Sequence, residues 1–443
     1  MPSAMEEGQR SELGDLLPLV GGGRGGRSLW SRPLLAVLLL YSFSSQFLPI
    51  EPYLVPYLTS VKGFSNFQVT VDIYPCSVYA QLVFTLLMAP ACFYLSHKLV
   101  ISLGVLGMLA TYIIIWVGNS LLSMQIMQVT YGFGMSARLV FSSYIFHLVA
   151  EEEYQSMTSL TTTASLLSFM LASELGQFLA LQEVSYWTFF VITLSSLGIC
   201  SVSSFLLPKD HSSSSVPSVT TYFQQNKGWI RILKETWHGR TLQFLSLWSA
   251  FAYAGFSLVQ NYGTNLFDAI DPKSKLNGHI LAAAQAAGSL GSFSAVYLEN
   301  FASKSGMLIY VLGSALMSIF CVYMGICAKI WAAYFFYVVI SGIYQALACL
   351  ISVRCSRLLS NGQYILLFSV NNFLGLLFET LLQAAVEIFG LSVFAQFISF
   401  SGFFFLATAV FVGLCFFDGG RNQSASYILR GESKYHISDD IET

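Results

Sequence analysis

Charged residues are scarce in this chain. Only 10% of its 443 residues are Asp, Glu, Lys or Arg, whereas 55% are hydrophobic and the mean hydropathy is +0.64. A soluble globular domain carries roughly 25% charged residues, because water must wet its surface. A chain with so little charge can cover itself only if most of its surface faces lipid. The net charge of −2 also provides no broad basic surface for nucleic acid.

Motifs of enzymes and metal sites are missing as well. The sequence contains no Walker A segment, no glycine-rich dinucleotide fingerprint and no nucleophile elbow, which argues against soluble enzymes and ATP-driven transport. The eight cysteines include no CxxC pair or Cys/His cluster, and the six histidines are dispersed. We therefore expect no catalytic residue, no cofactor and no metal ion. A membrane-embedded transferase is disfavoured, because it would need a His or Asp/His site at one face.

Long apolar segments dominate the rest of the sequence. A membrane-spanning helix needs about 20 mostly apolar residues. Cutting the apolar runs at polar residues, Gly and Pro leaves twelve segments, approximately 33–50, 69–95, 99–118, 124–149, 158–181, 185–207, 242–267, 277–299, 306–328, 330–358, 362–390 and 393–417. This pattern predicts an all-α membrane protein with 12 transmembrane helices in two six-helix bundles, 33–207 and 242–417. The layout resembles the major facilitator architecture, in which substrate binds near the bilayer midplane between two rocking halves.

Three polar regions flank these bundles. Residues 1–32 are polar and rich in glycine, which predicts a disordered tail without a cleaved signal peptide. The central loop, 208–241, contains a short amphipathic segment at 229–233 that is suited to the membrane surface. The last region, 418–443, is again polar and ends in acidic residues.

The distribution of basic residues predicts the orientation. Sixteen of the 21 Lys and Arg residues fall in the tails and loops on the same side as the N-terminus, and four fall on the other side. Because cytosolic segments carry the excess of Lys and Arg, both termini and the central loop are expected in the cytosol. The sequon at Asn422 then lies in the cytosol and should not be glycosylated.

Ionisable residues within the predicted spans mark candidate sites, because they are costly in lipid unless paired or hydrated. They are Glu51, Asp72, Arg138, Glu174 and Glu379. Glu51 lies between Pro49 and Pro52, which remove backbone donors and interrupt the first span. A carboxylate beside such an interruption can hold a cation or a proton, although a residue at a helix end can also reach the headgroups.

The other ionisable residues leave two interpretations open. Arg138 either clamps a substrate carboxylate or phosphate or pairs with Glu51, Glu174 or Glu379. Glu379 has apolar neighbours, so it is a candidate for proton coupling or a carboxyl group that packs between helices. Glu174 is a weaker candidate for coupling or gating. Asp72 is typical of an acid at a helix start.

Four tyrosines lie one or two turns from these charges. They are Tyr74, Tyr131, Tyr144 and Tyr262. Aromatic rings stack on flat apolar groups. A heteroaromatic substrate would therefore find suitable partners here.

Several short strings resemble the reduced folate carrier and thiamine transporter family. In family order they are QFLPIEPYLVPYL (46–58), DIYP (72–75), MQ (124–125) with YG (131–132), SSYIF (142–146), YQ (154–155), GF (255–256) with NY (261–262), LNG (276–278) and VN (370–371). The resemblance runs from the first span to the eleventh. It implies uptake of folate or thiamine across the plasma membrane without ATP, with folate-type members exchanging organic anions and thiamine-type members binding a cation.

The resemblance to the folate branch is partial. Arg138 matches the fourth-helix arginine of folate carriers. However, Ser341, Ala395 and Glu379 stand where those carriers have basic residues in the second half.

The resemblance to the thiamine branch is also partial. Glu51, Tyr74, Tyr131 and Asn261 match that branch's pocket, whereas its fourth-helix glutamate is Gln128 here. Its second-helix tryptophan is Ser77, and Tyr112 and Phe169 replace two further aromatics.

We expect Glu51 and Gln128 to hold the polar end of the substrate, tyrosines to flank its ring and Asn261 to add a hydrogen bond from the second bundle. Acids outnumber Arg138 within the spans, which favours a thiamine-like cation over a reduced folate. A coupled proton or organic anion is expected. Another heterocyclic solute and a non-transporting receptor with the same fold are the alternatives.

Overall fold

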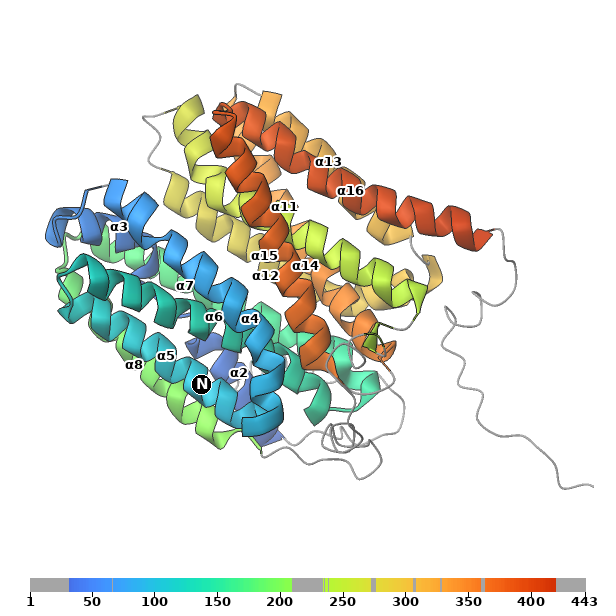
Figure 1. The fold of residues 1–443 in the computed structure, drawn as a ribbon, viewed down its shortest axis with the longest axis horizontal. Helices are drawn as coiled ribbons and strands as arrows, with labels where there is room; N and C mark the ends of the chain where they lie inside the picture. Colours follow the sequence, from blue (N-terminus) through green and yellow to red (C-terminus); the bar gives the residue numbers. More distant parts are fainter. Residues whose placement is uncertain are drawn as a thin grey trace, which may run out of the picture. The chain divides into compact units, whose positions relative to one another are not determined.

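A computed structural model describes most of the chain. The described residues are 32–65, 67–208, 234, 236–237, 239–271, 276–305, 308–326, 329–359 and 363–419. They are largely helical, and no strand occurs among them (Figure 1). The amphipathic segment expected at 229–233, the sequon at Asn422 and nearly all of both predicted tails lie outside the described residues.

The chain divides into two compact units, Met1–Thr221 and Tyr222–Thr443. In the first, the elements are α2 (Arg32–Ser44), η1 (Glu51–Tyr53), α3 (Leu54–Pro56), η2 (Tyr57–Val61), η3 (Gln68–Ile73), α4 (Pro75–Leu95), α5 (His97–Val117), α6 (Leu121–Leu148), η4 (Glu151–Glu153), α7 (Tyr154–Leu181) and α8 (Tyr186–Leu206). In the second they are α11 (Arg240–Ile270), α12 (Asn277–Ser305), α13 (Leu308–Ile326), α14 (Ile330–Arg357), α15 (Tyr364–Ile388) and α16 (Val393–Gly419).

Ten helices of the described chain are long and apolar enough to cross a membrane: α4, α5, α7, α8 and α11 to α16. Many of their large apolar side chains are exposed, such as Leu290 at 71% and Phe335 at 62%. Extended apolar surfaces of this kind are rare on soluble monomers and are suited to lipid. The all-α membrane class predicted from the sequence is therefore confirmed.

Two predicted spans are not continuous helices. The segment 33–50 ends as a helix at Ser44, and 69–95 begins with a π-helical turn before α4 starts at Pro75. Proline explains both changes, because it cannot donate a backbone hydrogen bond and is favoured at the first turn of a new helix. α6 is long enough to span but is not among the ten; its sequence includes Arg138 and several Gln and Ser residues.

Small residues allow the helices to approach closely. A Cβ added to Gly132 of α6 would lie 2.7 Å from the Cβ of Ala80 on α4, and Gly291 of α12 packs on the backbone of Gly342 on α14. Close packing of small residues drives helix association where lipid removes the hydrophobic force. Similar pairs run side by side in the second unit, such as α13 and α16 (Figure 1).

Candidate functional site

The first predicted span is interrupted between Ser44 and Glu51. Beyond the break the chain continues as a 3₁₀ turn, a single α turn and the π-helical turn Tyr57–Val61. π-helical turns are rare and often occur at functional sites. Irregular backbone at membrane depth is tolerated only when protein or a cavity satisfies its polar groups.

Serines on two neighbouring helices satisfy the carbonyl groups at this break. The hydroxyls of Ser165 and Ser168 on α7 and Ser196 on α8 donate to the carbonyl oxygens of Ser42, Phe43 and Ser44, at 3.2, 2.5 and 2.9 Å respectively. A helix end leaves its last carbonyls without partners in the helix, and a buried carbonyl without a partner is costly. The three serines therefore stabilise the interruption that precedes Glu51.

The segment around Glu51 is held from α6 and α7. The hydroxyl of Tyr131 donates to Oε1 of Glu51 at 3.0 Å, and Tyr53 donates to Oε1 of Gln177 at 2.7 Å. Gly176 lies so close to Pro49 that a Cβ added to it would be 2.6 Å from the Pro49 carbonyl oxygen. Glu51 is therefore fixed at the start of the 3₁₀ turn, half-buried beside α6.

Three tyrosines lie within electrostatic range of this carboxylate, and one of them, Tyr131, contacts it. The charge of Glu51 acts electrostatically on the hydroxyls of Tyr74, Tyr112 and Tyr131, and Arg138 acts on Glu51, Tyr112 and Tyr131. Together, Glu51, Tyr74, Tyr112, Tyr131 and Arg138 are called here the Glu51 cluster. Tyr112 is fully buried, and its hydroxyl has no hydrogen-bond partner among the described residues.

Tyr112 was not predicted as a site residue. In the sequence it lies within an apolar run of α5, with no ionisable neighbour to draw attention to it. Its relation to Glu51 depends on the packing of α5 against α6. The one signal in the sequence was its place among the aromatic positions of the thiamine branch.

Arg138 has no acidic partner within the described part of the chain. Within those residues, the guanidinium forms only one hydrogen bond, from Nη1 to Sδ of Met135 on the same helix, at 3.6 Å. The predicted ion pairs of Arg138 with Glu51 and Glu174 are therefore not formed, although Arg138 acts on Glu51 at longer range. The guanidinium keeps donors that a ligand can use.

Gln128 lies on the same helix as Tyr131, three residues earlier. Residues three apart share a helix face. Gln128 is only 6% exposed, and its side chain forms no hydrogen bond with the described residues. Its amide therefore adds an unused donor and acceptor near the Glu51 cluster.

Tyr144 lies apart from this cluster. It follows Tyr131 by 13 residues on α6, which corresponds to about 20 Å along a helix. Its hydroxyl donates to the carbonyl oxygen of Pro208, and its ring stacks on His97 with a centroid separation of 6.0 Å. The structure thus places Tyr144 at the far end of α6, where it joins α6 to the end of α8.

Glu174 supports the interrupted segment from α7. It is half-buried one turn before Gln177 and acts electrostatically on Tyr53. It therefore lies beside the residues that follow Glu51 and not at an isolated position in lipid.

The second unit contains a separate polar group around Glu379. The hydroxyl of Ser257 and Nδ2 of Asn261, both on α11, donate to Oε1 of Glu379 on α15, at 2.7 and 3.0 Å. Tyr262 is adjacent to Asn261 but packs on Phe400 of α16, with ring centroids 5.7 Å apart. Glu379 and Asn261 are thus brought together, whereas the ring of Tyr262 contributes to the helix core.

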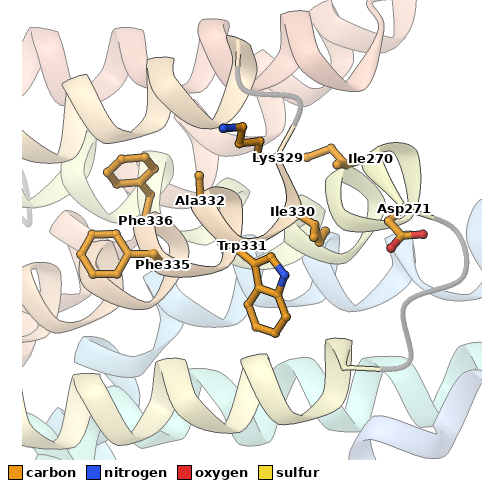
Figure 2. A pocket seen from close by; sticks show the side chains of 8 residues that line it. All are labelled: Ile270, Asp271, Lys329, Ile330, Trp331, Ala332, Phe335 and Phe336. Carbon is orange, nitrogen blue, oxygen red and sulfur yellow. The ribbon is translucent and has the colours of Figure 1, made fainter.

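An open pocket of about 730 Å³ lies at one end of the second unit. Figure 2 shows its lining side chains, which come from the end of α11 and the first turns of α14: Ile270, Asp271, Lys329, Ile330, Trp331, Ala332, Phe335 and Phe336. None of the predicted site residues lines it. Tryptophan and lysine at a helix end are typical of the membrane–water interface.

The chain is similar to several transporters. Human thiamine transporter 2 is 27% identical, over 87% of this chain and 90% of its own length. The human reduced folate transporter is 28% identical, over 88% and 73%. Folate transporter 1 of Caenorhabditis elegans is 26% identical, over 93% and 97%.

Solved structures show the same fold at lower identity. The human organic anion transporter MFSD10 superposes with a TM-score of 0.65 at 16% identity, covering 86% of this chain and 99% of that chain. The proton:xylose symporter XylE, of the major facilitator superfamily, superposes with a TM-score of 0.64 at 12% identity, covering 86% and 94%. These likenesses establish a major-facilitator fold.

A sequence profile described as reduced folate carrier matches residues 28–227 and 211–399. The two matches together cover well over half of the chain, including both groups of polar residues. The chain therefore belongs to the reduced folate carrier family, a family of transporters and not of enzymes.

Proposed function

We propose that this protein is a secondary transporter of a water-soluble vitamin, and that its substrate is a thiamine-like organic cation. The observation that carries the proposal is the Glu51 cluster, in which a fixed carboxylate lies among three tyrosines beside an interrupted helix. The relatives named thiamine transporter and reduced folate transporter support the vitamin class.

The chemistry of the Glu51 cluster suits a flat cation. A carboxylate in a site of low dielectric attracts a positive charge much more strongly than it would in water. Tyrosine rings bind cations through their faces and stack on heteroaromatic rings. The unused hydroxyl of Tyr112 and the amide of Gln128 can accept or donate hydrogen bonds to ring nitrogens or hydroxyls.

The proposed architecture has 12 spans. α2 with its interrupted continuation forms the first span and α6 the fourth, which completes the set with the ten apolar helices. Two six-helix bundles, 33–207 and 242–417, then alternate access to a site near the midplane. The bias of Lys and Arg supports a cytosolic location for the tails 1–32 and 418–443 and for the loop 208–241. We place the protein in the plasma membrane, as its family resemblance implies.

A reduced folate is the second candidate, and Arg138 favours it. Its guanidinium has no acidic partner within the described chain, and such a group binds carboxylates through two parallel hydrogen bonds. Exchange with an organic anion would then drive uptake. For a thiamine-like cation, Arg138 instead limits the attraction of Glu51 for cations, and a proton is the coupled ion.

Uptake of radiolabelled thiamine and of a reduced folate, measured separately in cells that lack their own carriers, tests the proposal. We expect thiamine uptake that excess unlabelled thiamine blocks. Glu51→Gln should abolish it without changing the amount of protein at the surface, because the carboxylate charge is lost at nearly constant shape. Glu152→Gln, an exposed carboxylate in η4, is the matched control and should transport normally.

The other outcomes discriminate between the alternatives. If the protein takes up folate and Arg138→Gln abolishes this uptake, Arg138 binds the substrate carboxylate and the hypothesis of a thiamine-like substrate is wrong. Normal uptake by Glu51→Gln would remove Glu51 from the site. Surface protein that moves neither vitamin would indicate another heterocyclic solute or a non-transporting receptor.

A further inference from the structure

Among the described residues of the second unit, Glu379 is the most deeply buried acidic side chain. It is 7% exposed and lies in the middle of α15, facing α11. Its Oε1 accepts hydrogen bonds from Ser257 and Asn261. Its Oε2 is buried and has no hydrogen-bond partner among the described residues. One oxygen of the carboxyl group thus has two hydrogen-bond donors, and the other oxygen has none among the described residues.

No cationic side chain of the described residues pairs with this carboxyl group. Within the described chain, Glu379 forms no ion pair with a Lys, Arg or His side chain, and its polar contacts are those with Ser257 and Asn261. An ionised carboxylate that is buried without a charge partner costs several kcal/mol, and such a group usually becomes neutral instead. A proton on Oε2 would remove the charge at the oxygen that lacks a donor.

The titratable side chains around Glu379 supply no positive charge either. Tyr253 on α11 and Tyr344 on α14 are the phenols that Glu379 influences electrostatically. Phenols are uncharged at neutral pH, so neither supplies a positive charge. Gly375, one turn before Glu379, allows the Tyr253 ring to approach α15, where a Cβ would lie 2.7 Å from Cδ1 of Tyr253. The Tyr253 ring therefore packs on α15 one turn from Glu379.

An exposed polar side chain lies next to this buried carboxyl group. Asn261 is exposed, and its Nδ2 lies 3.0 Å from Glu379 and 3.4 Å from Oγ of Ser257. The hydroxyl of Ser257 can both donate and accept. Glu379 is therefore buried, but only one side chain separates it from the accessible face of α11.

We propose that Glu379 is the proton-carrying residue of this transporter, protonated on Oε2 in the conformation described here and deprotonated in another conformation during the transport cycle. An O–H bond forms on Oε2 when a hydronium ion transfers its proton and leaves as water, and the reverse transfer to water releases it. Ser257 and Asn261 are positioning residues, because they hold Oε1 and leave Oε2 for the proton. The role in transport rests on the proposed vitamin uptake.

Infrared spectroscopy of the purified full-length protein in lipid nanodiscs tests the protonation directly. We expect a C=O stretching band of a protonated carboxylic acid that shifts in D₂O. Glu379→Gln should remove this band, Ser257→Ala should shift it because Oε1 loses a donor, and Glu152→Gln should leave it unchanged. If Glu379→Gln removes no such band, Glu379 is ionised and the proposal is wrong.

Thiamine transport in proteoliposomes tests the coupling. With one proton per substrate, a gradient of one pH unit can drive accumulation of up to about tenfold. We expect Glu379→Gln to lose this accumulation whether the proton gradient across the liposome membrane points inward or outward. Exchange of external for internal thiamine should continue. Exchange needs no net proton transfer, so its survival shows that the substrate site is intact.

The outcomes separate this proposal from the proposed function. Accumulation by Glu379→Gln equal to that of the unmodified protein would overturn Glu379 as the coupling residue. Absence of thiamine exchange in the unmodified protein would reject thiamine as the substrate, and the infrared band would still decide whether Glu379 carries a proton.

Discussion

Gly176 provides the sharpest test of how the interrupted helix supports Glu51. A Cβ added to Gly176 on α7 would lie 2.6 Å from the carbonyl oxygen of Pro49, whereas ordinary contact begins at 3.4 Å. The Gly176→Ala variant must therefore move α7 and the segment at Pro49 apart by about 0.8 Å. The contact is a backbone atom, so no side-chain rotation can relieve it.

Gly176→Ala is expected to lower both stability and uptake. Inserting a methyl group into a packed site typically costs about 1–3 kcal/mol. Glu51 follows Pro49 by two residues and should shift with it, and a displacement of 1 Å in a binding site can reduce a rate on the order of 100-fold. We expect uptake to fall by roughly ten- to 100-fold, together with a lower melting temperature in detergent.

Gly198→Ala on α8 is the matched control. A Cβ at Gly198 meets nothing within 4 Å. Alanine in a helix interior is more favourable than glycine by roughly 0.5–1 kcal/mol. Uptake should therefore be unchanged and the melting temperature equal or higher. If Gly176→Ala transports as well as Gly198→Ala at equal surface expression, the contact with Pro49 does not position Glu51.

Three further substitutions probe other contacts. Tyr131→Phe removes the hydrogen bond to the Glu51 carboxylate, which is worth about 1.5–3 kcal/mol. KM for the substrate should therefore rise about tenfold or more, and an unchanged KM would show that the Glu51 cluster does not bind the substrate. Ser168→Ala removes the hydroxyl donor of the Phe43 carbonyl, which keeps the Gln46 N–H, so the melting temperature should fall by an amount equivalent to about 0.5–1.5 kcal/mol, whereas Ser142→Ala, at an exposed hydroxyl, should not lower it. Tyr144→Phe should cost only about 0.5–1.5 kcal/mol of stability and leave KM unchanged; a KM effect like that of Tyr131→Phe would mean that Tyr144 acts in the site.

The membrane class and the candidate charges could be predicted from the sequence. A chain with 10% charged residues and long apolar runs can be stable only with lipid around it, whatever its detailed packing. Charges inside apolar runs are conspicuous for the same reason, so Glu51, Arg138 and Glu379 were identified without a structure.

The partners of these charges depended on the tertiary structure. Tyr131 lies 80 residues from Glu51, and Ser257 lies 122 residues from Glu379. Tyr131 and Tyr144 lie at similar distances from Arg138 in the sequence, on opposite sides of it. Only Tyr131 contacts Glu51, because 13 residues of helix separate the two tyrosines by about 20 Å.

Packing also decided what stabilises the interruption of the first span. Proline in the sequence showed that the first span breaks near Glu51, but not that serines of α7 and α8 bind the freed carbonyl groups. The burial of the Tyr112 hydroxyl and of Oε2 of Glu379 likewise follows from the approach of neighbouring helices. Hydropathy is a property of each segment alone, whereas hydrogen-bond partners and burial arise from segments that are distant in the sequence and meet only in the folded protein.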